Sequence, residues 1–454
     1  MILDGAPSLG KMRALSNASA SSSKIPARAY PDWLDWWWVE RARRQTGNTE
    51  PEEAVARYAG AVQKLSDLFT VARPGAEPVK PAKPGRAGAG FPDYGADEEL
   101  ATGYGLFYFP QSFVRTRLAL AEAVELRGWR PFDGDGDGRT ARVLDLGAGA
   151  GAAGLGAAMF LHERGLAEAV ELTAVDHSAD NLARLVALTR EKAERLPGLR
   201  VRTVAENALE WVKRESPRGT EAFNLIVLGF ALNEMLPAAL GLGPRLELLH
   251  QLRRSLSESG LLLVIEPALR ETAEPLQELS DALCGKGASS HGPPVPRWGP
   301  YLGDHGCPLR AEKKFWNHEV RRWTPPGAMT VLNRKLWREI GELKFAYALH
   351  GKQAPPELPE VFRATAKAPE ALTVRLVSPF HLGKGGFVAA AVSADGVKYT
   401  LDLPTRGLAK EEIARLEQIE RGDVLALRDL KALGAPRTMR LLTPTAIAAR
   451  YQVE

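Results

Sequence analysis

Short apolar runs alternate with helical stretches through the middle of the chain. The apolar runs cover residues 142–146, 170–175, 201–205, 223–228 and 260–265. Between them, segments such as 181–195 and 246–255 carry apolar residues at helical spacing. Because strands that alternate with helices form βαβ units, this pattern predicts an α/β domain with a mostly parallel sheet and helices on both faces.

The segments on either side of this alternation differ from it in composition. Residues 1–30 are rich in Ser and Ala and predict a disordered tail, and the Pro-rich residues 73–93 predict a linker. Helical segments are expected over 31–72 and in a lead-in over 94–140. The remaining expected divisions are an α/β domain at 141–380, an irregular insertion within it at 268–330, and a small β-rich region at 381–454.

The overall composition excludes several classes of protein. Of 454 residues, 45% are hydrophobic and 25% are charged, which is ordinary for a soluble protein long enough to form more than one domain. The two cysteines exclude a disulfide scaffold and a zinc site made of four cysteines. A net charge of +4 permits an RNA partner without requiring one. No apolar run approaches the roughly 18 residues needed to span a membrane, and no secretory signal is recognisable, so we expect a cytoplasmic protein.

The most informative stretch is a glycine-rich turn, DLGAGAGAAG, between the first expected strand and the following helix. Gly147, Gly149 and Gly151 allow unusual backbone angles and let a ligand approach the chain closely. The N-terminus of the following helix offers unpaired N–H groups to a bound ligand. Asp176 ends the next strand, where a carboxylate can accept hydrogen bonds from both ribose hydroxyls. The turn and the acid together predict a nucleotide-containing cofactor.

Two cofactors are compatible with this turn. Gly149, Gly151 and Gly154 fit the GxGxxG pattern of nicotinamide dinucleotide sites. The longer string that begins at Asp145 resembles motif I of class I S-adenosylmethionine methyltransferases. A carboxylate just before the turn suits the cationic methionine part of that cofactor but would repel a pyrophosphate. We therefore favour S-adenosylmethionine over a nicotinamide oxidoreductase, with a purely packing role of the glycines as the third interpretation.

The resemblance to class I methyltransferases implies further contacts at the ends of the next two strands. Asn207, or Glu206 beside it, occupies the position that often meets the adenine amine, although either can instead cap the following helix. Leu228 and Gly229 end the fourth strand, where substrate and cofactor methyl meet in such folds. Neither an Asn/Asp-Pro-Pro-Tyr motif nor a cysteine pair suited to cytosine C5 chemistry is present, so no catalytic residue is assigned. Methyl transfer depends mainly on positioning, so catalysis is not excluded.

Several segments, taken in order, resemble the methyltransferase-like proteins associated with the small ribosomal subunit of mitochondria and bacteria. The matching segments are 143–154, 223–235, 260–267, Cys307-Pro-Leu, Phe315-Trp-Asn-His, 344–347, 375–379 and 384–386. The resemblance implies a Rossmann-like class I methyltransferase fold with a mostly parallel, seven-stranded sheet. It also implies S-adenosylmethionine as the cofactor and the small ribosomal subunit, through its rRNA, as the partner.

The insertion in that family carries cysteines that hold an iron–sulfur cluster, which usually needs four thiolates. Only Cys307 remains here, and Tyr301, Asn317 and Val392 stand in the other matched positions. Cys284 and nearby histidines have spacings that fit no standard zinc finger. We expect no iron–sulfur cluster and no other metal, with Cys307 as a remnant of the family's cluster site.

An RNA contact is predicted at Arg321 and Arg322, which lie between Trp316 and Trp323, because guanidinium and indole groups both stack on bases. The alternative is that the two arginines form ordinary solvated surface. The expected function is an S-adenosylmethionine-dependent methyltransferase, acting as a monomer on or at the small subunit. A non-catalytic ribosome assembly factor with the same fold, or a small-molecule methyltransferase, remains as an alternative.

Overall fold

The computed structural model describes residues 26–71, 93–133, 139–215, 221–285, 293–303, 305–309, 316–366, 371–383, 385–434 and 437–453. Most of the expected tail and linker lie outside these residues. The chain forms two units, and each draws on separate stretches of sequence. Unit 1 contains Met1–Leu120, Pro131–Ile265 and Trp323–Leu343, and unit 2 contains Ala121–Arg130, Glu266–Arg322 and Lys344–Glu454.

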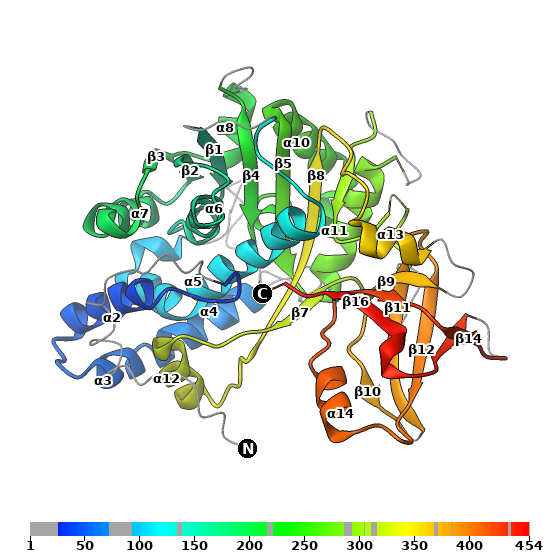
Figure 1. Ribbon diagram of the computed structural model, residues 1–454. Helices are drawn as coiled ribbons and strands as arrows, with labels where there is room; N and C mark the ends of the chain where they lie inside the picture. The colour runs from blue at the N-terminus through cyan, green and yellow to red at the C-terminus, as the bar shows by residue number, and fades with distance from the viewer. Residues whose placement is uncertain are drawn as a thin grey trace. The chain divides into compact units, whose positions relative to one another are not determined.

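Five parallel strands form the sheet of unit 1 in the order β3-β2-β1-β4-β5 (Figure 1). Their bounds are β1 (Thr140–Leu146), β2 (Ala169–Asp176), β3 (Leu199–Ala205), β4 (Phe223–Gly229) and β5 (Leu256–Pro267), the last ending in unit 2. From β1 the chain adds β2 and β3 on one side, and it then crosses to the other side of β1 to form β4. The carboxyl ends of β1 and β4 therefore flank the switch point of the strand order. The whole sheet has eight strands rather than the expected seven, and two short ones among them come from the insertion.

Helices connect these strands and confirm the predicted βαβ pattern. They are α6 (Ala152–Glu163), α7 (Ala179–Glu191), η3 (Ala193–Arg195), α8 (Ala208–Arg214), α9 (Leu232–Met235), η5 (Ala238–Leu240) and α10 (Leu242–Arg254). Small residues let α6 approach its neighbours closely, and a Cβ on Gly156 would lie 2.7 Å from the carbonyl oxygen of Phe113. Nearly the whole of α6 is therefore buried, which fixes the glycine turn that precedes it.

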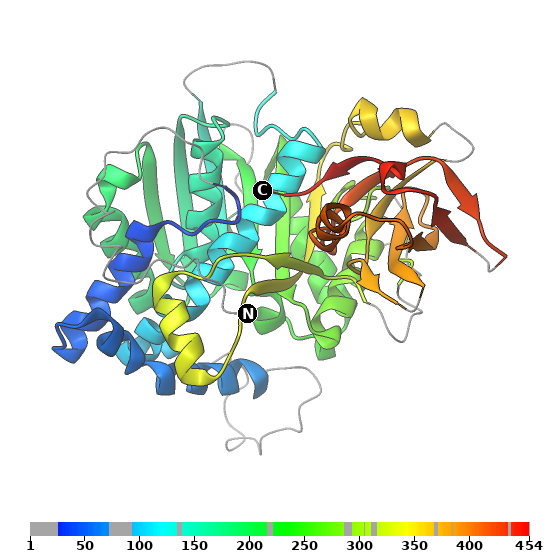
Figure 2. The same cartoon turned by 60° about the horizontal axis from the view of Figure 1, so that its bottom comes forward.

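The N-terminal helices pack together with a helix from late in the sequence (Figure 2). They are α2 (Asp32–Thr46), α3 (Pro51–Ala56), α4 (Ala59–Val71), η1 (Tyr94–Ala96), α5 (Glu98–Ala121) and α12 (Gly327–Leu336). Asp35 on α2 accepts a hydrogen bond from the backbone N–H of Ala328 at the start of α12. Trp38 is buried so tightly on α5 that a Cβ on Gly105 would lie 2.1 Å from the indole.

The part of the insertion that belongs to unit 2 is more regular than the sequence predicted. It contains α11 (Arg270–Leu283), β6 (Arg297–Gly299) and β7 (Glu319–Arg322), and both strands pair with β8 (Glu342–Gly351). Pro275 lies inside α11, and a proline at that place is why the sequence pattern did not indicate a helix. The five-residue π-helix η2 (Glu122–Leu126) and the helix α13 (Glu360–Ala366) complete this part of unit 2.

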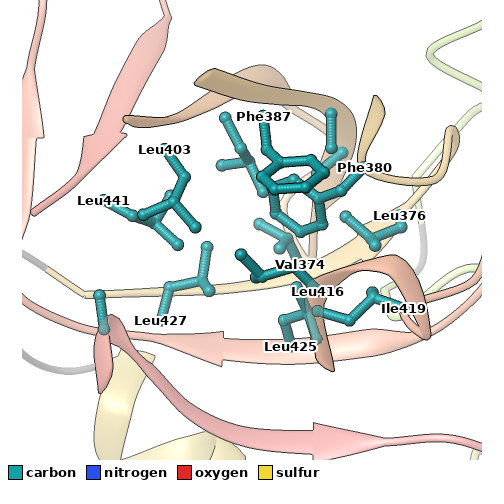
Figure 3. Packing of buried hydrophobic residues seen from close by; sticks show 14 of the residues in the cluster. Val374, Leu376, Phe380, Phe387, Leu403, Leu416, Ile419, Leu425, Leu427 and Leu441 are labelled. Atoms are coloured by element: carbon teal, nitrogen blue, oxygen red, sulfur yellow. The ribbon is translucent and has the colours of Figure 1, made fainter. Parts of the chain in front are cut away.

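A second sheet, also in unit 2, has the strand order β14-β15-β12-β11-β9-β13-β16, with β10 paired to β11. Its strands are β9 (Leu372–Leu376), β10 (His381–Leu382), β11 (Gly386–Ser393), β12 (Lys398–Pro404), β13 (Val424–Leu427), β14 (Leu430–Ala432), β15 (Thr438–Leu441) and β16 (Ile447–Tyr451). Leu416 and Ile419, on and just after α14 (Lys410–Glu417), pack with Phe387 and Leu425 in the apolar core of this sheet (Figure 3). Because β9 lies inside the sheet, the β-rich region begins before residue 381.

Unit 2 also contains a network of buried charges. Arg375 donates hydrogen bonds to both carboxylate oxygens of Glu122, at 2.6 and 3.0 Å, and to Glu319 at 2.8 Å. Arg321 pairs with Glu319 and with Asp423, at 2.9 and 2.7 Å. Burial disfavours the ionised form of Glu319, but Arg375 and Arg321 outweigh it and hold its pKa below the ordinary value. The network joins η2, β7, β9 and the turn before β13 through paired charges.

Candidate cofactor site

The glycine turn after β1 has the backbone conformation that the sequence predicts. Gly147, Gly149 and Gly151 have φ angles of 75°, 53° and 83°, which residues with a side chain rarely adopt. The N–H of Gly147 donates to the carbonyl of Val175 at 2.9 Å, so the turn is held against the end of β2. A Cβ on Gly147 would lie 2.4 Å from the Cβ of Ala231, so a larger residue does not fit there.

Asp145, near the end of β1, is buried beneath this turn and is 1% exposed. Its Oδ2 accepts the backbone N–H of Gly154 at 2.7 Å, while its Oδ1 is buried without a hydrogen-bond partner among the described residues. Burial raises the pKa of Asp145 to about 7, against the lowering effect of the Gly154 N–H, and the charge of Asp176 raises it further. An unpaired buried carboxylate oxygen is costly, and a cation placed beside it would relieve that cost.

Asp176, at the end of β2, links two turns at the same edge of the sheet. Its Oδ2 accepts the N–H of Gly149 at 2.8 Å, and its Oδ1 accepts the N–H of Ser178 at 2.8 Å. The side chain therefore fixes the glycine turn as well as the start of α7. A carboxylate oxygen accepts more than one hydrogen bond, so these bonds leave capacity for ribose hydroxyls.

Asn207 has the capping role that the sequence left open. Its Oδ1 accepts the N–H groups of Leu209 and Glu210, at 3.0 and 3.3 Å, at the start of α8. Glu206 is paired with Arg214, with one contact at 2.7 Å. Since the amide oxygen of Asn207 is already bonded, a contact with an adenine would use its exposed Nδ2 group instead.

The end of β4 carries a strained residue that the sequence did not indicate. Leu228 is fully buried, and a Cβ on Gly229 would lie 2.7 Å from that of Ala153, so the strand end packs directly on α6. Phe230 follows with a φ of 66°, unusual for a bulky side chain. Its ring is covered by Arg115, whose guanidinium carbon is 5.2 Å from the ring centroid. Strain of this kind concentrates at functional sites.

Aromatic residues from η1 and α5 form a wall beside the turn, and sequence reasoning missed them. Tyr94 and Tyr104 have ring centroids 5.3 Å apart, and Tyr104 stacks on Tyr108 at 5.9 Å. The hydroxyl of Tyr94 lies 3.6 Å from the position of a Cβ on Gly149. Burial raises the pKa of Tyr94 and Tyr104, and the charge of Asp176 adds to both shifts, so their hydroxyls stay neutral donors. All three tyrosines are partly buried, and the local sequence pattern does not reveal what they face.

Arg115 adds a cation to the same wall. Its Nη2 donates to Gln111 at 3.0 Å, and burial lowers its pKa to about 10, so it remains charged at neutral pH. The site in unit 1 therefore combines buried carboxylates, neutral phenols and the partly buried guanidinium of Arg115. This set suits a zwitterionic or mixed-charge ligand better than a polyanion.

The predicted RNA contact at Arg321 is wrong. Its side chain is 2% exposed, and its guanidinium is enclosed by Glu319 and Asp423, so it cannot stack on a base. Arg322 is exposed and donates to the carbonyl of Glu417 at 2.9 Å, so a nucleic-acid contact there stays a prediction. The alternation of a β-strand explains the difference, because neighbouring side chains on β7 point to opposite faces.

The residues at the positions matched to cluster ligands make a hydrogen bond and an apolar contact instead. The hydroxyl of Tyr301 donates to Cys307 Sγ at 2.6 Å, and Val392 packs in the small apolar cluster that Cys307 also touches. Asn317 donates to Gln277 at 3.0 Å. Among the described residues, no group of three or more His, Cys, Asp or Glu side chains could hold a metal ion. A phenol and a valine are not cluster ligands, so these residues do not fit an iron–sulfur group.

No model of a protein family matches the sequence, and no curated protein matches it. Solved structures with similar arrangements include the YcgJ protein from Bacillus subtilis, which is 19% identical. The match covers 33% of this chain and 50% of that protein, with a TM-score of 0.22. The chain thus spans about half the length of that protein. Precorrin-6y C5,15-methyltransferase from Geobacter metallireducens is 12% identical, covers 47% of this chain and 82% of its own, with a TM-score of 0.26.

An rRNA methylase from Streptococcus thermophilus is 11% identical and covers 47% of this chain and 87% of its own, with a TM-score of 0.23. Because all three TM-scores lie below 0.5, the fold is defined by the strand order and the turn of the chain itself. The order β3-β2-β1-β4-β5, with an acid near the end of β1 and a glycine turn after it, is the Rossmann-like fold of class I methyltransferases. Among the described residues, no helix is long and apolar enough to cross a membrane.

Proposed function

We propose that the protein binds S-adenosylmethionine at the glycine turn and acts as a methyltransferase. The observation that carries this proposal is Asp145, a buried carboxylate with an unpartnered oxygen directly beneath the turn. The cationic methionine part of the cofactor would supply the partner that this oxygen lacks. A nicotinamide dinucleotide would instead bring a pyrophosphate toward two carboxylates, which is electrostatically unfavourable.

Each part of the cofactor has a residue suited to it. Asp145 and the glycines at 147, 149 and 151 would hold the methionine part, and Asp176 would accept the ribose hydroxyls. Asn207 would meet the adenine through its Nδ2 group, and Leu228 and Gly229 would line the side of the reacting methyl. When bound, the cofactor supplies an electrophilic methyl group. The phenols of Tyr94 and Tyr104 and the apolar strand end would exclude water there.

The proposed substrate is RNA, at or near the small ribosomal subunit. The resemblance of the insertion and C-terminal segments to the ribosome-associated family supports this, as does one surface feature of unit 1. Trp337 is 96% exposed at the end of α12, with the exposed side chains of Arg334 and Lys335 close by in the helix. An exposed indole beside cations suits stacking on an unpaired base. Trp337 would therefore take the role that the sequence assigned to Arg321.

A titration of S-adenosylmethionine followed by calorimetry tests the cofactor site. We expect binding by the wild type, loss of about a hundredfold in affinity for Asp145→Asn, and a similar loss for Asp176→Ala. Asp180→Ala is the matched control, because Asp180 is exposed on α7 and should leave binding unchanged. Circular dichroism would check that each variant is folded. Failure of the folded wild type to bind would overturn the proposal.

The RNA step needs a separate experiment with isolated small subunits and radiolabelled cofactor. Transfer of label to rRNA, lost in Asp145→Asn, would support methylation. Co-sedimentation without transfer, equal in wild type and Asp145→Asn, would favour the alternative of a non-catalytic assembly factor, which the existing bonds of Asp176 and Asn207 to the backbone also favour. Neither transfer nor co-sedimentation would leave a small-molecule methyltransferase as the better interpretation.

A further inference from the structure

A cavity of about 650 Å³ lies inside unit 2 and is separate in sequence from every residue of the proposed cofactor site. Its wall is formed by Arg127 after η2, the segment 294–297 that leads into β6, and the segment 354–358 before α13. Ligand pockets commonly have volumes of about 300–1,000 Å³, so this cavity is large enough for a small molecule.

Apolar side chains cover most of the wall. Leu302 and Phe362 belong to a buried apolar cluster with Leu126, and Leu358 packs against it. Prolines add rigid surface, and those that line the cavity are Pro294, Pro296, Pro355 and Pro356. A rigid apolar wall favours an apolar body and loses little entropy when it is covered.

The three arginines of the cavity wall differ in their burial and in their hydrogen-bond partners. Arg297 is committed within unit 2, since it donates to Asp281 at 2.7 Å, to the carbonyl of His305 at 2.6 Å and to Ser280 at 3.1 Å. Arg363 is half-exposed and paired with Glu357. Arg127 differs from both, because it is buried and its one hydrogen bond goes to a backbone carbonyl.

Arg127 is 4% exposed, and its Nη2 donates to the carbonyl of Tyr301 at 2.7 Å. Among the described residues, its Nε is buried without a hydrogen-bond partner. Burial lowers the pKa of Arg127, and the nearby charge of Glu122 only partly opposes that shift. A buried guanidinium that lacks a carboxylate partner is unfavourable by itself and becomes favourable when an anion binds.

We propose that this cavity binds a small organic anion, with a single carboxylate on an apolar body, and that Arg127 receives the carboxylate. The prolines and Phe362 would cover the apolar body. The alternative is a purely structural Arg127 that only fixes the carbonyl of Tyr301. The two interpretations differ in whether the negative charge of a ligand matters.

Octanoate and octanol distinguish these interpretations, because they share an apolar chain and differ in charge. The purified full chain is titrated with the fluorescent anion 1-anilinonaphthalene-8-sulfonate, and the bound probe is then displaced by each compound. Saturating S-adenosylmethionine is present throughout, so that the probe cannot report on the glycine turn. We expect octanoate to displace the probe at a concentration about tenfold lower than octanol does.

Two variants test the residues. Arg127→Gln should weaken octanoate about tenfold and leave octanol unchanged, whereas Arg363→Gln, a rim residue with its own partner, should change neither by more than about twofold. Ala354→Trp fills the exposed side of the cavity with Arg127 intact, and it should weaken both compounds. It also keeps the test decisive if Arg127→Gln does not fold.

Equal displacement by octanoate and octanol would overturn the proposal, as would unchanged octanoate binding in folded Arg127→Gln. Absence of probe binding by the wild type would overturn it too. The Arg127→Gln and Ala354→Trp variants change residues of unit 2 alone, so failure of this test would leave the methyltransferase proposal untouched. If S-adenosylmethionine does not bind, the comparison of these variants still assigns the displaced probe to the cavity.

Discussion

Two buried charged side chains, Arg375 in unit 2 and Asp145 in unit 1, differ in whether their charges have partners. In unit 2, Arg375 lies between Glu122 and Glu319, and each of its contacts goes to a carboxylate. In unit 1, Asp145 is equally buried, yet one oxygen has no partner and its pKa is raised to about 7. Paired burial holds segments of chain together, whereas unpaired burial costs stability until a ligand arrives. An unpartnered buried carboxylate is therefore a candidate ligand contact when it lies beneath a glycine turn, as Asp145 does, whereas Asp35, which also has an unpartnered buried oxygen, joins α2 to α12.

The largest expected effect comes from breaking the compensated network. Arg375→Met leaves Glu122 and Glu319 buried with fewer cations, and we expect the free energy of unfolding to fall by about 3–5 kcal/mol. Chemical denaturation by urea measures it. Arg440→Met is the control, since its ion pair with Asp402 is partly exposed and should contribute about 1 kcal/mol or less. Equal losses in the two variants would contradict the distinction between buried and surface pairs.

The glycine turn should be sensitive to backbone geometry rather than to charge. Gly147→Ala places a Cβ at positive φ and 2.4 Å from that of Ala231, and we expect a loss of about 2–4 kcal/mol. Gly165→Ala shares the positive φ, but no described atom lies within 4 Å of its Cβ, so about 1–2 kcal/mol is expected. Thermal unfolding of both variants measures the difference, which isolates the packing contribution. A Gly147→Ala variant no less stable than Gly165→Ala would show that the turn is less confined than described.

The pH dependence of stability sharpens the comparison at Asp145. Its pKa is raised from 3.8 to about 7 in the folded protein, so the folded state holds a proton that the unfolded state releases. The stabilisation is complete below pH 3.8 and is lost as the pH rises toward 7, by up to about 1.4 kcal/mol per pH unit. Asp145→Asn should lack this decline, so the unfolding free energy of the wild type should fall relative to the variant between pH 5 and 7.

The quantity to measure is the difference in the free energy of unfolding between the wild type and Asp145→Asn. Asp35, with a pKa also raised to about 7, contributes a decline of the same sign, and His318, with a pKa lowered to about 4, contributes the opposite one. Both contributions are present in wild type and variant and cancel in the difference. A difference that is flat from pH 5 to 7 would mean that Asp145 is already ionised and compensated. Added S-adenosylmethionine should reduce the slope in the wild type alone.

The sequence pointed to the parts of the candidate site that depend on neighbouring residues. Asp145 and the three glycines could be placed because a strand, a turn and a helix follow one another within a short stretch, and Asp176 could be placed because it ends the next strand. The aromatic wall could not, because whether Tyr94 and Tyr104 face the turn depends on how η1 and α5 pack. Arg321 was misplaced for the same reason, since its partner Asp423 lies 102 residues further along the chain. The local sequence pattern does not reveal pairs of residues that lie far apart in the chain.

Trp337 extends the comparison to the surface and should give the smallest effect. It ends α12 at a φ of 52°, where glycine is usual, and it exposes 96% of its surface, so both its backbone and its side chain lack compensation. Trp337→Gly should therefore raise the free energy of unfolding by about 0.5–1 kcal/mol, and Trp337→Ala, which keeps the backbone strain, should leave it nearly unchanged. Both variants should bind small-subunit RNA more weakly, because both lose the indole. A gain in stability without a loss of RNA binding would show that Trp337 is not an RNA contact. A strained and exposed residue indicates a binding site only when its replacement weakens binding.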